Sequence, residues 1–270
     1  MSRVRHAERG MGLNDFALEH ALWDPMPLWD GQRYLMYVLA MDRDRAMELG
    51  SFFTRENAIH VFSSTDSVSW EYLGEAISPR NPEERLCAGN VLLHEGRYWF
   101  FGSATVDQFD EDHLDQRLFL AVSDDGLHFE HVPDFRLEPD PEVCPHGRFH
   151  PVEGRMLFAW RDPWPLYDPA TATFVVFVCT GGERWGCPPE VVMATSDTLA
   201  GPYVLHGSVL QLSDQKGAAR ASAFQEIERV NVFAAPDGFL LTFSCWRRLV
   251  DSALLSRNCE VDEPLTDFTT

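Results

Sequence analysis

Basic residues are scarce in this chain of 270 residues. Lysine and arginine total 22 against 42 aspartates and glutamates, so the formal net charge is −20. A protein that binds a nucleic-acid backbone needs the opposite sign, and an anionic membrane surface would repel this chain. We therefore expect neither a nucleic-acid nor a membrane partner. A small neutral ligand, such as a carbohydrate or a glycosylated metabolite, remains compatible with the charge.

Zinc-type cysteine pairs, a secretory leader and a membrane span are also missing. The six cysteines are scattered without a Cys-x-x-Cys pair, which argues against a zinc site. The first twenty residues carry charges but no apolar stretch of the kind found in signal peptides, and no later apolar run is long enough to cross a bilayer. These absences predict a cytoplasmic protein with reduced thiols. The cysteines are Cys87, Cys144, Cys179, Cys187, Cys245 and Cys259.

Helical periodicity is absent outside the short stretch 42–49. Stretches rich in β-branched and aromatic residues recur instead between turn signals, which is typical of strands. The sequence therefore predicts an all-β fold. The clearest expected strands are 34–40, 58–63, 97–102, 117–122, 174–179, 190–194 and 239–244.

A longer repeat organises these strands. A strand that ends in serine, followed by an acidic turn and an aromatic residue, starts at Ser64, Ser123 and Ser196, with a degraded copy at Ser256. The acidic side chain is expected to hold a tight hairpin, and the aromatic residue to pack the outgoing strand. Modules of roughly sixty residues with four strands each are blade-sized, so we expect one β-propeller domain over residues 1–270. An irregular β-sandwich, the alternative, would not produce this spacing. The four modules begin near residues 21, 85, 156 and 224.

Three modules begin with a carboxylate. Asp24 lies in Trp-Asp-Pro-Met-Pro, Asp162 in Arg-Asp-Pro-Trp-Pro, and Glu228 in Glu-Ile-Glu-Arg, shortly before Asn-Val-Phe. If all three occupy the same phase of the innermost strands, a propeller directs them into its central channel. One Asp-Pro pair alone is usually a turn signal, but three acids at repeat positions favour a site. The second module has Cys-Ala-Gly-Asn, ending at Asn90, at this phase, which leaves room for a ligand.

Carboxylates gathered in one pocket repel each other, so the pKa of at least one should be raised. Cleavage of a glycosidic bond uses such a set, because one protonated acid serves the leaving oxygen and one carboxylate attacks the anomeric carbon or activates water. Arg161 and Arg229, each adjacent in sequence to one of the acids, are expected to temper the repulsion and hold hydroxyl groups.

These motifs resemble those of the five-bladed propeller furanosidases, glycoside hydrolase families 68, 32 and 43. The likeness is strongest to family 68, the levansucrase and inulosucrase group. That family carries a nucleophile in Trp-Asp-Ser-Trp-Pro, a stabilising acid in Arg-Asp-Pro, and an acid/base in Asp-Glu-Ile-Glu-Arg followed by Asn-Val-Phe. The order and spacing of the three motifs agree over nearly the whole chain.

The resemblance implies a role for each motif residue. Asp24 would be the nucleophile of a retaining double displacement, Glu228 the general acid and base, and Asp162 the transition-state stabiliser. The expected substrate-binding residues are Trp23, Asn90, Arg161, Trp164, Glu226, Arg229 and Arg247. The expected activity is hydrolysis or transfer of a furanosyl unit, most naturally fructosyl.

Four departures from the family pattern accompany this likeness. The stretch Cys87-Ala88-Gly89-Asn90 stands where the family has Trp-Ser-Gly-Ser-Ala, whose first serine contacts the nucleophile, and Pro25 follows the nucleophile position. The basic residue expected after the acid/base strand falls at or near Trp246, beside Arg247. Only about four blades are evident. Three explanations stay open, namely a truncated chain, closure of the ring by residues 1–20, or a compact variant with four full blades, and a homodimer would cover open sheet edges.

Two alternatives to a fructosyl enzyme stay open. One is an inverting arabinofuranosidase or xylosidase of the family 43 kind, and the other is a repurposed propeller that binds a sugar or a partner without cleaving it. We expect no cofactor and no catalytic metal. A structural calcium ion in the acid-rich stretch 107–115 stays open, although the stretch lacks the ordered ligand alternation of an EF-hand. The Cys-Pro-His loop at 144–150 matches no zinc spacing.

Overall fold

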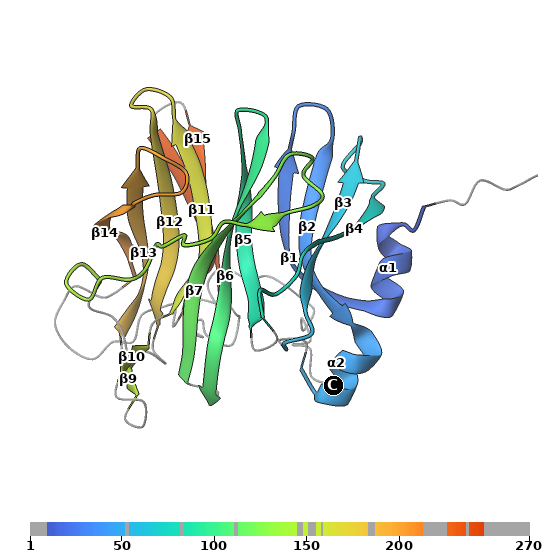
Figure 1. The fold of residues 1–270 in the computed structure, drawn as a ribbon, viewed down its shortest axis with the longest axis horizontal. Coiled ribbons are helices and arrows are strands. Elements are labelled where there is room, and N and C mark those ends of the chain that lie inside the picture. Colours follow the sequence, from blue (N-terminus) through green and yellow to red (C-terminus); the bar gives the residue numbers. More distant parts are fainter. Residues whose placement is uncertain are drawn as a thin grey trace, which may run out of the picture.

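The computed structural model describes residues 10–51, 54–81, 84–110, 113–144, 148–150, 155–157, 159–182, 187–212, 226–235 and 238–245. Antiparallel sheets dominate this part of the chain, and they fan out around the strands that begin each module (Figure 1). The predicted all-β propeller architecture is confirmed. No helix among the described residues has both the length and the apolar character needed to cross a membrane.

The sheets follow the chain order. The first contains β1 (His20–Trp29), β2 (Tyr34–Asp42), β3 (Ala58–Ser64) and β4 (Glu71–Ile77). The second contains β5 (Arg85–His94), β6 (Arg97–Asp110), β7 (His113–Ser123) and β8 (Glu130–His131). The third contains β11 (Trp160–Asp168), β12 (Thr173–Gly182), β13 (Cys187–Ser196) and β14 (Val204–Gln211). In the described part of the fourth, β15 (Glu228–Ala235) pairs with β16 (Gly238–Ser244).

The module boundaries need one correction. The third blade begins at Trp160, whereas residue 156 lies in β10 (Arg155–Leu157), which pairs with β9 (Arg148–His150) as a separate two-stranded sheet. The predicted start of the fourth module, residue 224, lies outside the described residues, and β15 begins at Glu228.

Alternating side chains hold neighbouring blades together. Phe100 packs into the apolar layer between the first and second sheets, whereas the next residue, Phe101, packs into the layer between the second and third. Phe119 and Leu120 on β7 divide in the same way. Successive strand residues face opposite sides of a sheet, so one strand supplies both layers. A third layer, including Val191 and Val232, lies between the third and fourth sheets.

At Ser64 and Ser123 the repeated serine and acid form the predicted hairpin turns, whereas at Ser196 the serine hydroxyl accepts from the amide of Thr198. Ser123 Oγ accepts hydrogen bonds from the Asp125 and Gly126 amides, and Asp125 Oδ1 accepts from the next two amides at 2.7 and 2.9 Å. Asp66 accepts from two amides in the same manner after Ser64. The degraded copy at residue 256 lies outside the described residues.

Two short helices flank the first sheet in the described part of the chain. The predicted 42–49 helix is present as α2 (Arg43–Leu49), capped by the Asp42 side chain. α1 (Leu13–Glu19) was not predicted from helical periodicity, because Phe16 is the one residue that it buries. Phe16 packs on the outer side of the first sheet, and Tyr72 of β4 donates its amide to the carbonyl of Met11.

Candidate active site

A bulge interrupts each innermost strand at the same point of the blade. The pairing register shifts between Trp23 and Met26, between Leu86 and Gly89, between Arg161 and Trp164, and between Glu228 and Asn231. A bulge places an extra residue opposite one partner residue and changes the direction of the side chains beside it. The four-fold repetition therefore turns one short segment of every blade towards the common centre.

Three of the bulges contain a left-handed residue that is not glycine. Asp24 and Asp162 both have φ of 53°, and Arg229 has φ of 54°. Such a conformation is strained for a residue with a β-carbon, and strain of this kind concentrates at functional sites. Asp24 and Asp162 are thus equivalent positions in blades one and three.

Glu228 is offset from the other two acids by one residue. Its register position matches Trp23 and Arg161, while Arg229 is the counterpart of Asp24 and Asp162. The expectation that the three acids share one phase of the repeat was therefore wrong by one position for Glu228. In the fourth blade the bulge brings an arginine, not a carboxylate, to the equivalent position.

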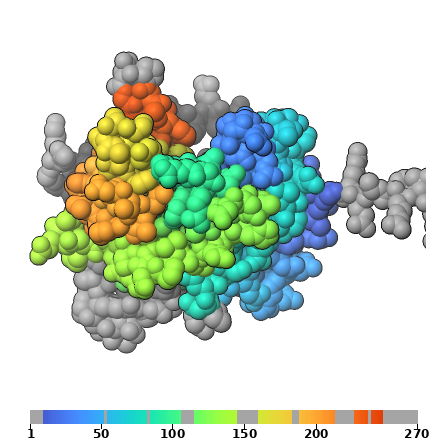
Figure 2. All heavy atoms as spheres, turned by 45° about the horizontal axis from the view of Figure 1, so that its top comes forward, coloured from blue at the N-terminus to red at the C-terminus, as the bar shows by residue number. Residues whose placement is uncertain are grey.

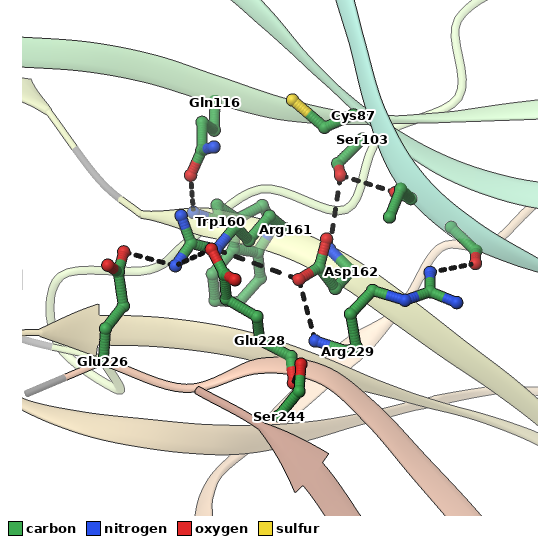
Figure 3. A network of polar contacts seen from close by, with 12 residues as sticks. Cys87, Ser103, Gln116, Trp160, Arg161, Asp162, Glu226, Glu228, Arg229 and Ser244 are labelled. Atoms are coloured by element: carbon green, nitrogen blue, oxygen red, sulfur yellow. Dashed lines mark hydrogen bonds and ion pairs between the residues drawn. The ribbon is translucent and has the colours of Figure 1, made fainter. Parts of the chain in front are cut away.

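Arg161 is the centre of the charged network (Figure 3). Its guanidinium donates to Glu226, lies 3.3 Å from Glu228 Oε1, and lies 3.9 Å from Asp162 Oδ2. Burial alone would lower the pKa of Arg161, but the charges of Glu226 and its neighbours hold that pKa well above its usual value. One buried cation therefore neutralises part of a cluster of acids from two blades.

Asp162 is held by contacts with the second and fourth blades. Its side chain is buried, and Oδ2 accepts a hydrogen bond of 2.9 Å from the amide of Arg229. Its own amide donates to Ser103 Oγ at 3.2 Å, and that hydroxyl donates to the carbonyl of Ala88 at 2.7 Å. These contacts fix both the bulge and the direction of the carboxylate.

The other two acids are less buried and have raised pKa values. Burial and the neighbouring charge of Asp162 raise the pKa of Asp24 to about 6, although Arg229 and Arg161 partly offset the shift. Burial raises the pKa of Glu228 to about 7, against the lowering effect of Arg161. The charge of Asp24 also contributes to the raised pKa of Glu228.

The structure gives structural partners to several of the predicted substrate-binding residues. Asn90 is buried and donates to the carbonyl of Pro163, which fixes the bulge of the third blade. The Trp164 indole donates to the carbonyl of Val232 at 2.9 Å, and its ring meets that of Phe233 edge-on. Trp23 packs at the margin of the layer between the first and second sheets. Arg247 and Trp246 lie outside the described residues.

Cys87 begins the stretch that replaces the serine motif of the resemblance. Its thiol is buried 3.7 Å from Thr105 Oγ1, and burial raises its pKa to about 12. Within the described residues, no hydrogen bond reaches the carboxylate of Asp24. Ser103 and Gln116 were missed at the sequence level, because a lone small or amide residue in an apolar strand gives no specific signal.

The described residues contain no group of three or more histidine, cysteine or acidic side chains arranged to hold a metal ion. Most of the two stretches considered for calcium and zinc lies outside the described part, namely the side chains of 106–114 and residues 145–147 of the loop after Cys144. Within the site itself, Arg161 supplies the positive charge next to the acids.

No protein-family model matches the sequence, and no curated protein does. Solved structures, however, share the fold. A GH32 β-fructofuranosidase from Bombyx mori superposes with a TM-score of 0.60 at 14% identity, over 82% of this chain and 41% of that one. An inulosucrase from Halalkalicoccus jeotgali gives 0.60 at 20% identity, over 87% and 62%.

Levansucrase from Bacillus subtilis gives a TM-score of 0.57 at 16% identity, over 87% of this chain and 66% of that one. The chain thus spans between about two fifths and two thirds of the length of these enzymes. At these identities the likeness concerns the fold. The protein has the β-propeller fold of the furanosidases of glycoside hydrolase families 32 and 68.

Proposed function

We propose that the protein is a glycoside hydrolase or transglycosylase that cleaves a furanosyl bond, most naturally fructosyl, by a retaining double displacement. Asp24 attacks the anomeric carbon, Glu228 protonates the leaving oxygen and then activates the acceptor, and Asp162 stabilises the positively charged transition state. The substrate is a small carbohydrate or a glycosylated metabolite. No metal or cofactor takes part in this scheme.

The observation that carries the proposal is that Asp24, Asp162 and Glu228, from three blades, lie close enough to influence one another's charge, and that the buried Arg161 lies beside Asp162 and Glu228. The raised pKa of Glu228 fits a general acid, because such a group must still hold its proton near neutral pH. Glu228, with a pKa of about 7, meets this need, and Asp24, with a pKa of about 6, is largely ionised at pH 7.

Asp162 fits the third role for a different reason. A group that stabilises developing charge works best when it is already oriented, so that no reorganisation accompanies the reaction. The amide of Arg229 and the bulge contacts with Ser103 supply that orientation before any substrate enters.

The primary test is release of sugar from sucrose, raffinose and aryl furanosides. Wild-type protein is compared with Glu228→Gln and Asp24→Asn, which preserve shape while removing the charge. We expect each substitution to lower the rate by roughly 10²–10⁴-fold. Equal, negligible release by all three proteins would rule out the catalytic scheme.

The stereochemistry separates this proposal from an inverting enzyme. Proton NMR of the first product to form reports the anomer before mutarotation, and a retaining enzyme gives the anomer of the substrate. An inverted first product from an arabinofuranoside or xyloside would instead support the family 43 alternative.

One observation favours a second function, sugar binding without cleavage. The carboxylate of Asp24 receives no hydrogen bond from the described residues, and the stretch Cys87-Ala88-Gly89-Asn90 replaces the motif that would hold the serine donor. Calorimetric titration with the same sugars distinguishes the two functions. Saturable binding without product supports a binding propeller, whereas turnover excludes it.

A further inference from the structure

Arg229 makes contacts with each of the three other blades that the structure describes. It lies on β15, directly after Glu228, and its backbone is left-handed. Its amide donates to Asp162 Oδ2 of the third blade at 2.9 Å. Its guanidinium donates to the carbonyl of Gly89 in the second blade at 3.0 Å and to that of Pro25 in the first at 2.8 Å.

The acceptors of Arg229 lie in or next to the bulges that shape the site. Pro25 immediately follows Asp24 in the bulge of β1, and Gly89 ends the bulge of β5. A contact to Pro25 therefore restrains the backbone that carries the Asp24 side chain. A guanidinium is a planar, permanently charged fork, so it can hold two carbonyls at a fixed separation, which a lysine ammonium cannot do equally well.

The strained backbone of Arg229 has a local explanation. A left-handed residue other than glycine persists only where its surroundings determine it strongly. The amide bond to Asp162 and the two guanidinium bonds provide this restraint, and Asn231 adds a fourth contact by donating to the carbonyl of Arg229 at 2.7 Å.

We propose that Arg229 is a positioning residue that sets the place of Glu228 and of the Asp24 backbone relative to Asp162, and is not a residue that holds the sugar. The proposal rests on the proposed function for the roles of the acids. In Figure 3 the guanidinium extends away from Glu228 towards a backbone carbonyl. Two of its nitrogens are already engaged by the protein itself.

Arg229 also has an electrostatic consequence that can be measured without any substrate. Its charge lowers the pKa of Asp24, against burial and Asp162, which raise it. Removing the charge while keeping an apolar stem should therefore raise the pKa of Asp24. Keeping the charge on a lysine should leave that pKa nearly unchanged but loosen the geometry, so the two effects of Arg229 can be separated.

The experiment compares Arg229→Met and Arg229→Lys with wild type and with a control, Arg136→Gln, whose side chain is 67% exposed and far from the acids in the sequence. NMR titration of ¹³C-labelled aspartate, assigned with Asp24→Asn, follows the Asp24 carboxyl. We expect its midpoint to rise by roughly half a pH unit or more in Arg229→Met and to stay near the wild-type value in Arg229→Lys and in the control.

Hydrogen exchange supplies the geometric readout. Amides of 22–27 and 226–232 should exchange faster in both Arg229 variants and at the wild-type rate in the control. An unchanged Asp24 midpoint in Arg229→Met, or unchanged exchange in both segments, would overturn the positioning role. If Arg229→Met does not fold, Arg229→Lys alone decides through exchange.

Kinetics then separate positioning from sugar contact. We expect Arg229→Lys to lower kcat at least tenfold with little change in KM, because a misplaced acid affects the reaction more than ground-state binding. A raised KM at unchanged kcat would assign Arg229 to the sugar. If wild-type protein cleaves none of the substrates, the proposed function fails, while titration and exchange still test Arg229.

Discussion

At the scale of single residues, the two titrating acids predict a narrow pH optimum. Asp24 must be ionised to attack, so activity should rise as the pH passes about 6. Glu228 must be protonated to assist departure, so activity should fall as the pH passes about 7. The rate constant kcat/KM measured from pH 4 to pH 9 should therefore be bell-shaped with its maximum between these values.

The variant Glu228→Gln tests whether ionisation of Glu228 causes the fall in activity above pH 7. Glu228→Gln with a substrate whose leaving group needs no proton, such as an activated aryl furanoside, should retain measurable turnover and lose the fall above pH 7. Persistence of the same fall in this variant would mean that another group controls it.

Glu228 also links stability to pH. Its folded-state pKa of about 7 lies above the unfolded value near 4.5, so ionisation in the folded protein is unfavourable. The stability that protonated Glu228 contributes is complete below about 4.5 and is lost as the pH rises through about 7. The loss is on the order of 3 kcal/mol, at about 1.4 kcal/mol for each pKa unit.

Glu228→Gln should accordingly raise Tm at pH 8 by roughly 5 °C or more and leave it nearly unchanged at pH 5. Arg161 keeps Glu226 and Asp162 as partners in this variant. Glu138→Gln, at an exposed side chain, is the matched control and should show no pH-dependent change. A lower Tm for Glu228→Gln at pH 8 would contradict the raised pKa.

The sequence predicted the acids more completely than their surroundings. Asp24, Asp162 and Glu228 lie in local motifs, so a sequence pattern of a few residues is enough to identify them. The offset of Glu228 and the contacts of Arg229 arise from where a bulge begins, which depends on the partner strand and on other blades. No local pattern encodes such contacts between residues up to 204 positions apart.

At the scale of strands, Gly89 on β5 has no room for a side chain. A β-carbon there would lie 2.1 Å from the carbonyl oxygen of Phe101 and 2.7 Å from the α-carbon of Gly102. Both are backbone atoms of the paired strand, so relief requires β5 and β6 to move apart. That movement would also displace the carbonyl that accepts from Arg229.

We therefore expect Gly89→Ala to destabilise the protein by about 3 kcal/mol or more, as overpacking against backbone does at its upper range. Chemical denaturation followed by fluorescence measures the change. Gly12→Ala is the control, because its added carbon would meet its nearest neighbour at 3.5 Å, an ordinary contact. Equal stability of the two variants would show that β5 tolerates a wider separation.

The hairpins and the helices differ in how well local sequence predicts them. The turns at Ser64 and Ser123 depend on side chains two or three positions away, so their sequence carries the whole interaction. α1 depends on one apolar residue, Phe16, that packs on strands as distant as β4. The third blade begins later than predicted. The short extended segments of the β9–β10 sheet precede it and have the same strand-like sequence character.

At the scale of the whole molecule, apolar layers between blades bring acids from separate sheets together. Each layer forms from alternate residues of two sheets, so the relative placement of Asp24, Asp162 and Glu228 follows from the packing of three layers. Figure 2 shows the blades packed side by side, with the first and second (blue to green) next to each other and the third (yellow to orange) beside the second. The carboxylates of this acidic centre are part of the net charge of −20 that the chain carries.

Mutual repulsion of these negative charges predicts a stabilising effect of salt. Charges on the surface interact over a Debye length of about 10 Å at 0.1 M salt and about 3 Å at 1 M, so added salt screens the excess of carboxylates. Unfolding spreads the same charges apart, and the folded state therefore gains more from screening. Tm should rise by a few degrees between 0.02 M and 0.5 M NaCl at pH 8, and KCl should give the same rise because screening does not depend on the cation. A fall in Tm with either salt would mean that attractive ion pairs, such as those of Arg161, outweigh the net repulsion.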